Sequence, residues 1–269
     1  MCVPGCLQHV QSGLNRRGFL GAGALAAGAA LVAPRAMAQS RSFAKVVDLT
    51  HTISPEFPTY FGVPGIELAD RFTYAKEKLN LKIWTVNEHT GTHIDSPFHF
   101  SESGWTVDLI PVENLVCPLC VVDIAARAQD DSDAQLTPDD IKAWEGKNGP
   151  IPAGACVAMR SGWDAHLGTD KFRNVDAEGI MHFPGFHPET IAMLVDGRQA
   201  VGIGVDTLSL DFGQSKDFAV HYGWLPTNRW GMECMAGLDT VPASGAILIA
   251  GAPKVKGATG GPARIFALV

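Results

Sequence analysis

The sequence has no run of lysine or arginine residues, and only 18% of its 269 residues are charged. Its formal net charge is −7. Nucleic acids and anionic membranes attract proteins through clustered positive charge, which this acidic chain does not offer. We therefore expect neither a nucleic acid nor a membrane surface among the partners of the mature chain.

The N-terminal apolar run, 21–33, is too short and too mildly apolar for a comfortable membrane span. A twin-arginine pair at 16–17 precedes it, and an A-x-A cleavage site at 36–38 follows it. This pattern is typical of a Tat-type export signal. We expect residues 1–38 to be removed and residues 39–269 to form one periplasmic domain. An uncleaved N-terminal anchor is the alternative.

Cysteine is scarce, with six residues in the chain. Four follow the expected signal, namely Cys117, Cys120, Cys156 and Cys234. Cys117 and Cys120 have the spacing of a redox motif, but their run is apolar, and thiols in such runs usually fill the core. In an oxidising compartment, a disulfide between two of these cysteines is the alternative.

Short apolar runs dominate the rest of the chain and predict buried strands. They cover 45–50, 79–86, 119–124, 155–160, 200–205, 246–250 and 264–269. Two helices are predicted, one after a Thr137 cap through Trp144 and one from Pro188 through Val195. The pattern favours a strand-rich α/β fold in a single domain.

The densest group of potential metal ligands lies between positions 89 and 99. It comprises His89, His93, Asp95 and His99. All four occupy odd-numbered positions, and side chains of an extended segment alternate between two faces. The spacing therefore predicts an extended segment with the four on one face. A helix would separate them, because it turns by about 100° per residue.

Gly91 lies midway between the first two histidines. In a flat strand, the Cα atoms of His89 and His93 would be about 13 Å apart, which is awkward for one shared ion. We expect the chain to bend at Gly91, where glycine tolerates it. His93 and Asp95 are two positions apart on the same face, so they can bind one ion without distortion of the strand. Four polar side chains on a solvated strand face are the alternative to a metal site.

One stretch rarely completes a coordination sphere. Spacing alone does not choose among the downstream candidates, which are His166, His182, His187, His221, Asp206, Asp211 and Glu233. The 89–99 stretch, however, resembles the His-x-Gly-Thr-His-x-Asp-x-Pro-x-His signature of the cyclase-like metal-dependent hydrolases. This superfamily includes bacterial kynurenine formamidases and isatin hydrolase. The likeness continues through 47–50, 202–207, 221–233 and 256–264, and it implies a swivelling β/β/α-type barrel.

The resemblance also implies roles for individual residues. His89, His93, Asp95, His221 and Glu233 match the metal ligands, and His99 matches the catalytic histidine. The formamidases bridge two zinc ions with the Asp and the Glu, whereas isatin hydrolase has Gln for that Glu and one manganese. Glu233 therefore favours capacity for two ions. Tyr60 occupies the position at which the formamidases have a tryptophan that contacts the substrate.

These residues lead us to expect Zn or Mn, one or two ions per chain, and a metal-dependent amidohydrolase. A divalent ion activates water and polarises a carbonyl, and His99 would transfer the proton. The expected substrate is a small cyclic or aryl amide, and we expect a homo-oligomer. Lactone or ester hydrolysis, a cyclisation or dehydration, and a non-catalytic periplasmic metal-binding protein are the alternatives.

Aromatic residues near the motif could wall a pocket for a planar substrate. They are Phe57, Tyr60, Phe61, Trp84 and Trp105. Packing in the core or at an interface is the alternative role for all of them except Tyr60.

Overall fold

The computed structural model describes one unit of the chain, residues 43–269. The expected export signal, 1–38, lies outside the described residues. Within the described range no helix combines the length and apolar character that crossing a bilayer requires.

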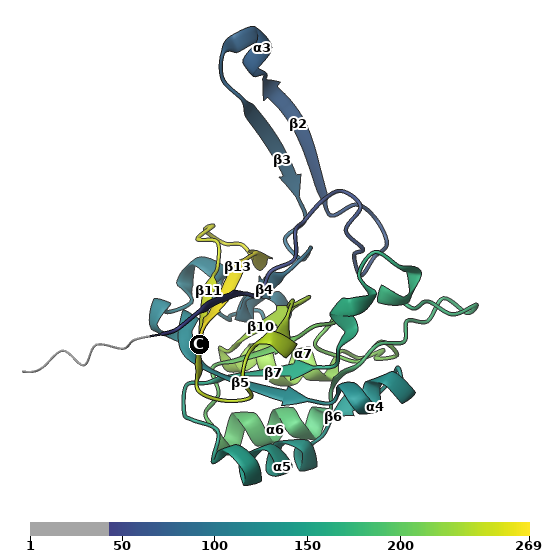
Figure 1. Cartoon of the computed structure of the whole chain (residues 1–269), viewed down its shortest axis with the longest axis vertical. Coiled ribbons are helices and arrows are strands. Elements are labelled where there is room, and N and C mark those ends of the chain that lie inside the picture. The colour runs from purple at the N-terminus through teal and green to yellow at the C-terminus, as the bar shows by residue number, and fades with distance from the viewer. Residues whose placement is uncertain (1–42) are drawn as a thin grey trace, which may run out of the picture. The chain divides into compact units, whose positions relative to one another are not determined.

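A curled nine-stranded mixed sheet is the centre of this unit (Figure 1). Its strand order is β1-β13-β11-β5-β7-β9-β10-β4-β12. The four central strands from β5 to β10 run parallel, and antiparallel pairs continue the sheet on both sides. The strands are β1 Val46–Asp48, β4 His93–Asp95, β5 Val116–Asp123, β7 Cys156–Arg160, β9 Gly202–Val205, β10 Trp230–Glu233, β11 Ala246–Gly251, β12 Gly260–Pro262 and β13 Arg264–Leu268.

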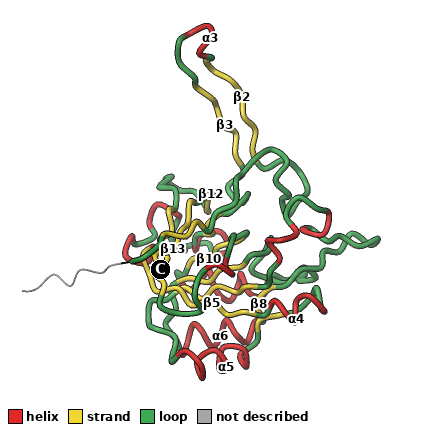
Figure 2. Tube along the Cα trace, in the orientation of Figure 1, coloured by secondary structure: helices red, strands yellow, loops and turns green. Residues whose placement is uncertain are grey.

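Two smaller sheets and a set of helices complete the unit (Figure 2). The small sheets pair β2 Ile66–Phe72 with β3 Leu81–Val86, and β6 Gln135–Leu136 with β8 Gly185–Phe186. The α-helices are α3 Tyr74–Glu77, α4 Ala125–Asp130, α5 Pro138–Asn148, α6 Pro188–Gly197 and α7 Ala219–Trp224. The 3-10 helices are η1 Pro97–Phe100, η2 Val107–Leu109, η3 Val112–Leu115, η4 Trp163–His166, η5 Asp170–Phe172, η6 Leu225–Thr227 and η7 Leu238–Thr240.

The sheet separates two hydrophobic cores because successive side chains of a strand point to opposite faces. On β5, Leu119 and Val121 belong to one core, whereas Cys120 and Val122 belong to the other. The second core continues into the helix layer of α5 and α6. Both faces of the central parallel strands are thus covered, which explains their continuous apolar sequences.

The predicted helices are both present. Thr137 caps α5 in a capping box with Asp140, and Pro138 occupies the first helical position. The helix continues past Trp144 to Asn148. The α6 helix begins at Pro188 as predicted.

Each predicted strand is also present, but one prediction about burial was wrong. The segment 79–86 was expected to be a buried strand, yet all six residues of β3 are exposed. With β2 it forms a hairpin that projects from the nine-stranded sheet (Figure 1). An apolar run indicates a strand, but it does not reveal whether a neighbour within the same chain covers that strand.

The 89–99 stretch is less extended than its spacing predicted. Only His93–Asp95 is a strand, and His99 lies in the 3-10 helix η1 after Pro97. The bend expected at Gly91 is confirmed, with φ of +64°. His89 and His99 therefore reach the same place as the strand residues through a turn on each side, rather than along one flat strand face.

The four cysteines of the described range are buried and free. Burial raises the pKa of the Cys117 and Cys120 thiols to about 12. Both thiols are therefore protonated at neutral pH and act as core side chains.

Candidate metal centre

The site forms where the short strand β4 pairs with β10. In this antiparallel register His93 lies opposite Glu233, and Asp95 lies opposite Gly231. The α7 helix brings His221 to the same place. Strand pairing therefore brings ligands that are about 140 positions apart in sequence into contact.

The polar atoms of this group are close and almost completely buried. His93 Nε2 lies 3.3 Å from Asp95 Oδ1 and 3.3 Å from Glu233 Oε2. His221 Nε2 lies 3.2 Å from Glu233 Oε1 and 3.7 Å from Asp95 Oδ2. Asp95 has no exposed surface. Two carboxylates and two imidazoles therefore face one another away from bulk water.

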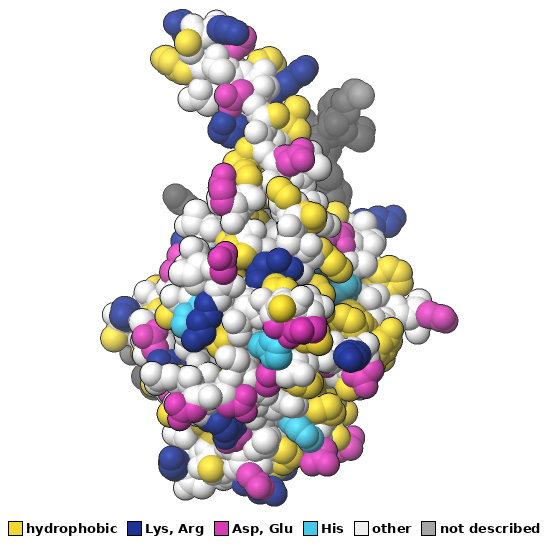
Figure 3. Space-filling model, turned by 90° about the vertical axis from the view of Figure 1, so that its right-hand side faces the viewer, with side chains coloured by type: hydrophobic (Ala, Val, Ile, Leu, Met, Phe, Trp, Pro, Cys, Tyr) yellow, Lys and Arg dark blue, Asp and Glu magenta, His cyan; other side chains and the backbone are white. Residues whose placement is uncertain are grey.

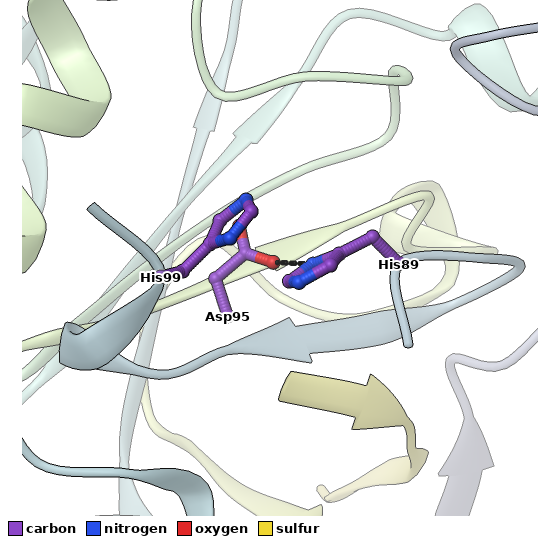
Figure 4. A group of neighbouring side chains, drawn as sticks. All are labelled: His89, Asp95 and His99. Atoms are coloured by element: carbon purple, nitrogen blue, oxygen red, sulfur yellow. Dashed lines mark hydrogen bonds and ion pairs between the residues drawn. The ribbon is translucent and has the colours of Figure 1, made fainter. Parts of the chain in front are cut away.

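A second group shares Asp95 (Figure 4). His89 Nδ1 lies 2.7 Å from Asp95 Oδ1, and the His99 ring stacks on the His89 ring at a centroid distance of 3.8 Å. One ligand atom from each of His89, Asp95 and His99 fits within 4.8 Å, and the same holds for His93, Asp95 and Glu233. Asp95 thus stands between two sets of potential ligands.

The donor set fits a divalent cation. Among the described residues, His93 Nε2 and Asp95 Oδ2 are buried and find no hydrogen-bond partner. Burial alone lowers the pKa of His93, but Asp95 and Glu233 outweigh burial and raise that pKa to about 10. The two carboxylates are therefore stable in this buried place only beside positive charge. A bound metal ion would supply that charge in place of protons on the histidines.

Hydrogen bonds outside the cluster orient the histidine rings. His221 Nδ1 lies 2.6 Å from Asp211, and His93 Nδ1 lies 2.9 Å from the carbonyl oxygen of Gly91. Each bond fixes one ring nitrogen and turns the other toward the carboxylates, as is common for metal-binding histidines.

His99 differs from its neighbours in its proton affinity. Burial lowers its pKa; Asp95 opposes that effect, whereas His89 and His221 reinforce it, and the pKa falls to about 4. The His99 ring is therefore neutral at pH 7 and able to accept a proton.

A cavity of about 300 Å³ opens onto the cluster. Tyr60 and Phe61 line it as predicted, together with Phe100 and Phe218. Tyr60 contacts the ring of Phe218 at a centroid distance of 6.1 Å. Burial and the charge of Glu233 raise the pKa of Tyr60, so its hydroxyl remains protonated and can donate a hydrogen bond. The wall is aromatic on several sides.

The other three aromatic residues near the motif do not line the cavity, and for Phe57 the alternative role in the core is confirmed. Phe57 packs in a core with Trp163 and Phe172, and Trp84 lies on the projecting hairpin. Trp105 does not line the cavity.

The structure brings together every residue predicted for the site, namely Tyr60, His89, His93, Asp95, His99, His221 and Glu233. His166, His182 and His187 do not line the cavity. Asp211 was one of several candidate ligands in the sequence, and the structure places it behind His221 instead. Sequence reasoning gave no role to Phe100 and Phe218, because nothing in their local sequence distinguishes them. Phe218 adopts φ of +50°, an unusual conformation for a side chain of its size, at the cavity wall.

Asp206, another candidate, lies elsewhere and has a structural role. Its buried carboxylate accepts hydrogen bonds from the backbone N–H groups of Ser161, Gly162 and Trp163. It therefore holds the turn after β7.

Comparison with known proteins agrees with this geometry. The Cyclase family model matches residues 47–212. Isatin hydrolase of Roseibium aggregatum is 39% identical over 197 residues, which cover 69% of this chain and 74% of that protein. Kynurenine formamidase of Salinibacter ruber is 26% identical over 221 residues, covering 81% and 95%.

Solved structures show the same likeness. Isatin hydrolase A from Ralstonia solanacearum superposes with a TM-score of 0.78 at 36% identity, covering 84% of this chain and 92% of that one. The chain therefore belongs to the Cyclase family and is an isatin hydrolase-like enzyme.

Proposed function

We propose that this protein is a metal-dependent amidohydrolase that cleaves the C–N bond of a small cyclic or aryl amide, with isatin as the first substrate to test. The observation that carries the proposal is a buried cluster of histidines and carboxylates at the bottom of an aromatic-walled cavity. A planar aromatic amide would match these walls. The likeness to isatin hydrolase supports the same substrate class.

The proposed cofactor is Zn or Mn, with one or two ions per chain. His89, His93, Asp95, His221 and Glu233 would hold them. When bound, such an ion activates water and polarises the substrate carbonyl.

The protein residues would then handle the protons and the orientation of the substrate. His99, whose ring is neutral at pH 7, accepts a proton from the attacking water and returns it to the nitrogen as the C–N bond breaks. Water thereby adds a hydroxyl group to the carbonyl carbon and its other hydrogen to the leaving nitrogen. Tyr60 would donate a hydrogen bond from the aromatic wall.

A substrate panel tests the proposed reaction. We expect metal-replete protein to hydrolyse isatin or formanilide, to lose this activity after treatment with EDTA, and to regain it with Zn or Mn. Product formation measured by chromatography would check the result. Turnover of an aryl lactone but of neither amide would point to ester chemistry instead. No turnover of any substrate would contradict the hydrolase assignment.

The ligand assignment predicts that His93→Ala and Asp95→Ala each lower the bound metal to less than a tenth of the wild-type content, because each removes a buried ligand atom. Elemental analysis of purified protein gives the metal content directly. The matched control is His166→Ala, which removes an imidazole outside the cavity and should leave the metal content unchanged. Full metal content in both site variants would refute the assignment.

His99→Ala should retain the metal and reduce kcat by about 10²–10⁴-fold, the range expected for a general acid–base group. Steady-state kinetics together with elemental analysis separates the two effects. A collapse of metal content together with activity would show that His99 is a ligand, which its place beside Asp95 and His89 also permits.

Glu233→Gln should lower the metal stoichiometry from near two toward one per chain. A neutral amide is a poorer bridge between two cations than a carboxylate. Titration under metal-saturating conditions, read by elemental analysis, checks this result, with exposed Glu178→Gln as the control. If wild type binds one ion and Glu233→Gln is unchanged, the single-metal arrangement is correct.

A further inference from the structure

His89, the first residue of the metal-binding stretch, follows a part of the chain that projects from the nine-stranded sheet. All six residues of β3 are exposed, and hydrophobic and charged side chains share the surface of the β2–β3 hairpin (Figure 3). The hairpin ends at Val86, three residues before His89. His93 and Asp95 belong to β4, but His89 lies outside every strand. Sheet pairing therefore does not fix the His89 ring, and side-chain contacts must do so.

Two contacts hold this ring, one on each nitrogen. His89 Nδ1 lies 2.7 Å from Asp95 Oδ1, and His89 Nε2 lies 2.9 Å from Thr259 Oγ1. Thr259 is 170 positions away in sequence. It directly precedes β12, which pairs with β4. The C-terminal segment therefore places a hydroxyl on the ring nitrogen that does not face Asp95.

Thr259 is itself held by residues next to the ligands. Its hydroxyl and its backbone N–H both donate to Glu88 Oε2, the N–H over 3.1 Å. Its carbonyl oxygen accepts from the backbone N–H of Ser96 at 2.9 Å and from the Ser96 hydroxyl at 2.8 Å. Glu88 directly precedes His89, and Ser96 directly follows Asp95. The Thr259 hydroxyl is therefore fixed relative to both ligands.

The number of available hydrogens decides the direction of the contact between His89 and Thr259. A hydroxyl has one hydrogen, and an ionised carboxylate only accepts. The Thr259 hydrogen therefore goes to Glu88, and the Thr259 oxygen can only accept from His89 Nε2. A neutral imidazole carries one N–H. With that hydrogen on Nε2, the lone pair of Nδ1 is left free on the side of Asp95.

The other two rings of the cluster have partners that leave no such choice. A carboxylate lies behind His221 and a main-chain carbonyl lies behind His93, and both of these groups accept. A threonine hydroxyl can donate or accept, so Thr259 alone would permit both tautomers of His89. Glu88 removes that choice because it takes the only hydrogen of the hydroxyl.

We propose that Glu88 and Thr259, here called the His89 relay, are positioning residues that hold the His89 ring as its Nε2–H tautomer and leave Nδ1 as its metal-binding atom. This inference rests on the metal-dependent function proposed above. The partner of the second ring nitrogen selects the tautomer of a metal-binding histidine and orients its ring. The relay therefore determines how tightly the chain holds its metal, and it does so through His89.

Zinc binding by the full protein, measured by competition with a chromophoric chelator, tests the relay. Thr259→Val keeps the backbone N–H but cannot accept from His89 Nε2. We expect it to weaken zinc binding about 10–100-fold, as for other partners of metal-binding histidines, with an unchanged circular dichroism spectrum. Thr259→Ser keeps the hydroxyl and should bind zinc like the wild type. The matched control is Thr240→Val, which loses a hydroxyl that bonds the Gly237 carbonyl and should also bind zinc normally.

Glu88→Ala should weaken zinc binding as well, because the freed Thr259 hydroxyl can then donate to His89 Nε2. The double variant should bind zinc about as weakly as Thr259→Val alone, since Glu88 acts through that hydroxyl. A direct readout is the nitrogen NMR spectrum of the histidine rings in the zinc-loaded wild type. It should show His89 bound to zinc through Nδ1, with the hydrogen on Nε2.

Unchanged zinc affinity in Thr259→Val, beside a wild type that binds zinc, would overturn the relay and leave the proposed function intact. Fully additive losses in the double variant, or a His89 bound through Nε2, would overturn the relay too. A wild type that binds no zinc would instead refute the metal centre itself, and the relay with it. Should Thr259→Val not fold, the nitrogen spectrum of the wild type decides.

Discussion

Two carboxylates, Asp95 and Glu233, are buried within a few ångströms of each other, and this charge constrains the rest of the site. A buried carboxylate is costly unless a cation or hydrogen bonds compensate it. The protein surrounds this pair with imidazoles rather than with lysine or arginine. Imidazoles are weaker bases that can give up their protons, so the same arrangement can exchange protons for a metal ion.

The sheet fixes the positions of the groups that compensate the charge of these carboxylates. The β4 strand lies between β10 and β12, and each neighbour presents a glycine beside Asp95, Gly231 and Gly260 respectively. A Cβ atom on Gly260 would lie 2.3 Å from the Ile94 carbonyl oxygen and 2.8 Å from His89 Cε1. Close strand approach and the placement of His89 therefore depend on the same small residue.

The segments that precede the first histidine of the cluster form part of the cavity wall and the β2–β3 hairpin. The loop that carries Tyr60 forms part of the aromatic wall. The β2–β3 hairpin comes after this loop and ends three residues before His89. Phe100 and Phe218 complete the wall from other segments, whereas His93, Asp95 and Glu233 lie on the buried strands β4 and β10.

The local sequence determined much of this protein. Continuous apolar runs specified the central strands, Thr137 and Pro138 specified the start of α5, and the 89–99 spacing specified four of the clustered groups. Gly91 correctly indicated the bend. These features depend on periodicity and on backbone conformation, which neighbouring residues control.

Tertiary structure decided the rest. Spacing could not choose His221 and Glu233, which only the resemblance to known hydrolases indicated, because their approach depends on strand pairing and on the placement of α7. It also could not show that Asp211 lies behind His221, or that the apolar strand β3 is exposed. Both depend on which surfaces meet across long stretches of chain, and the alternation of residues along one segment carries no information about that.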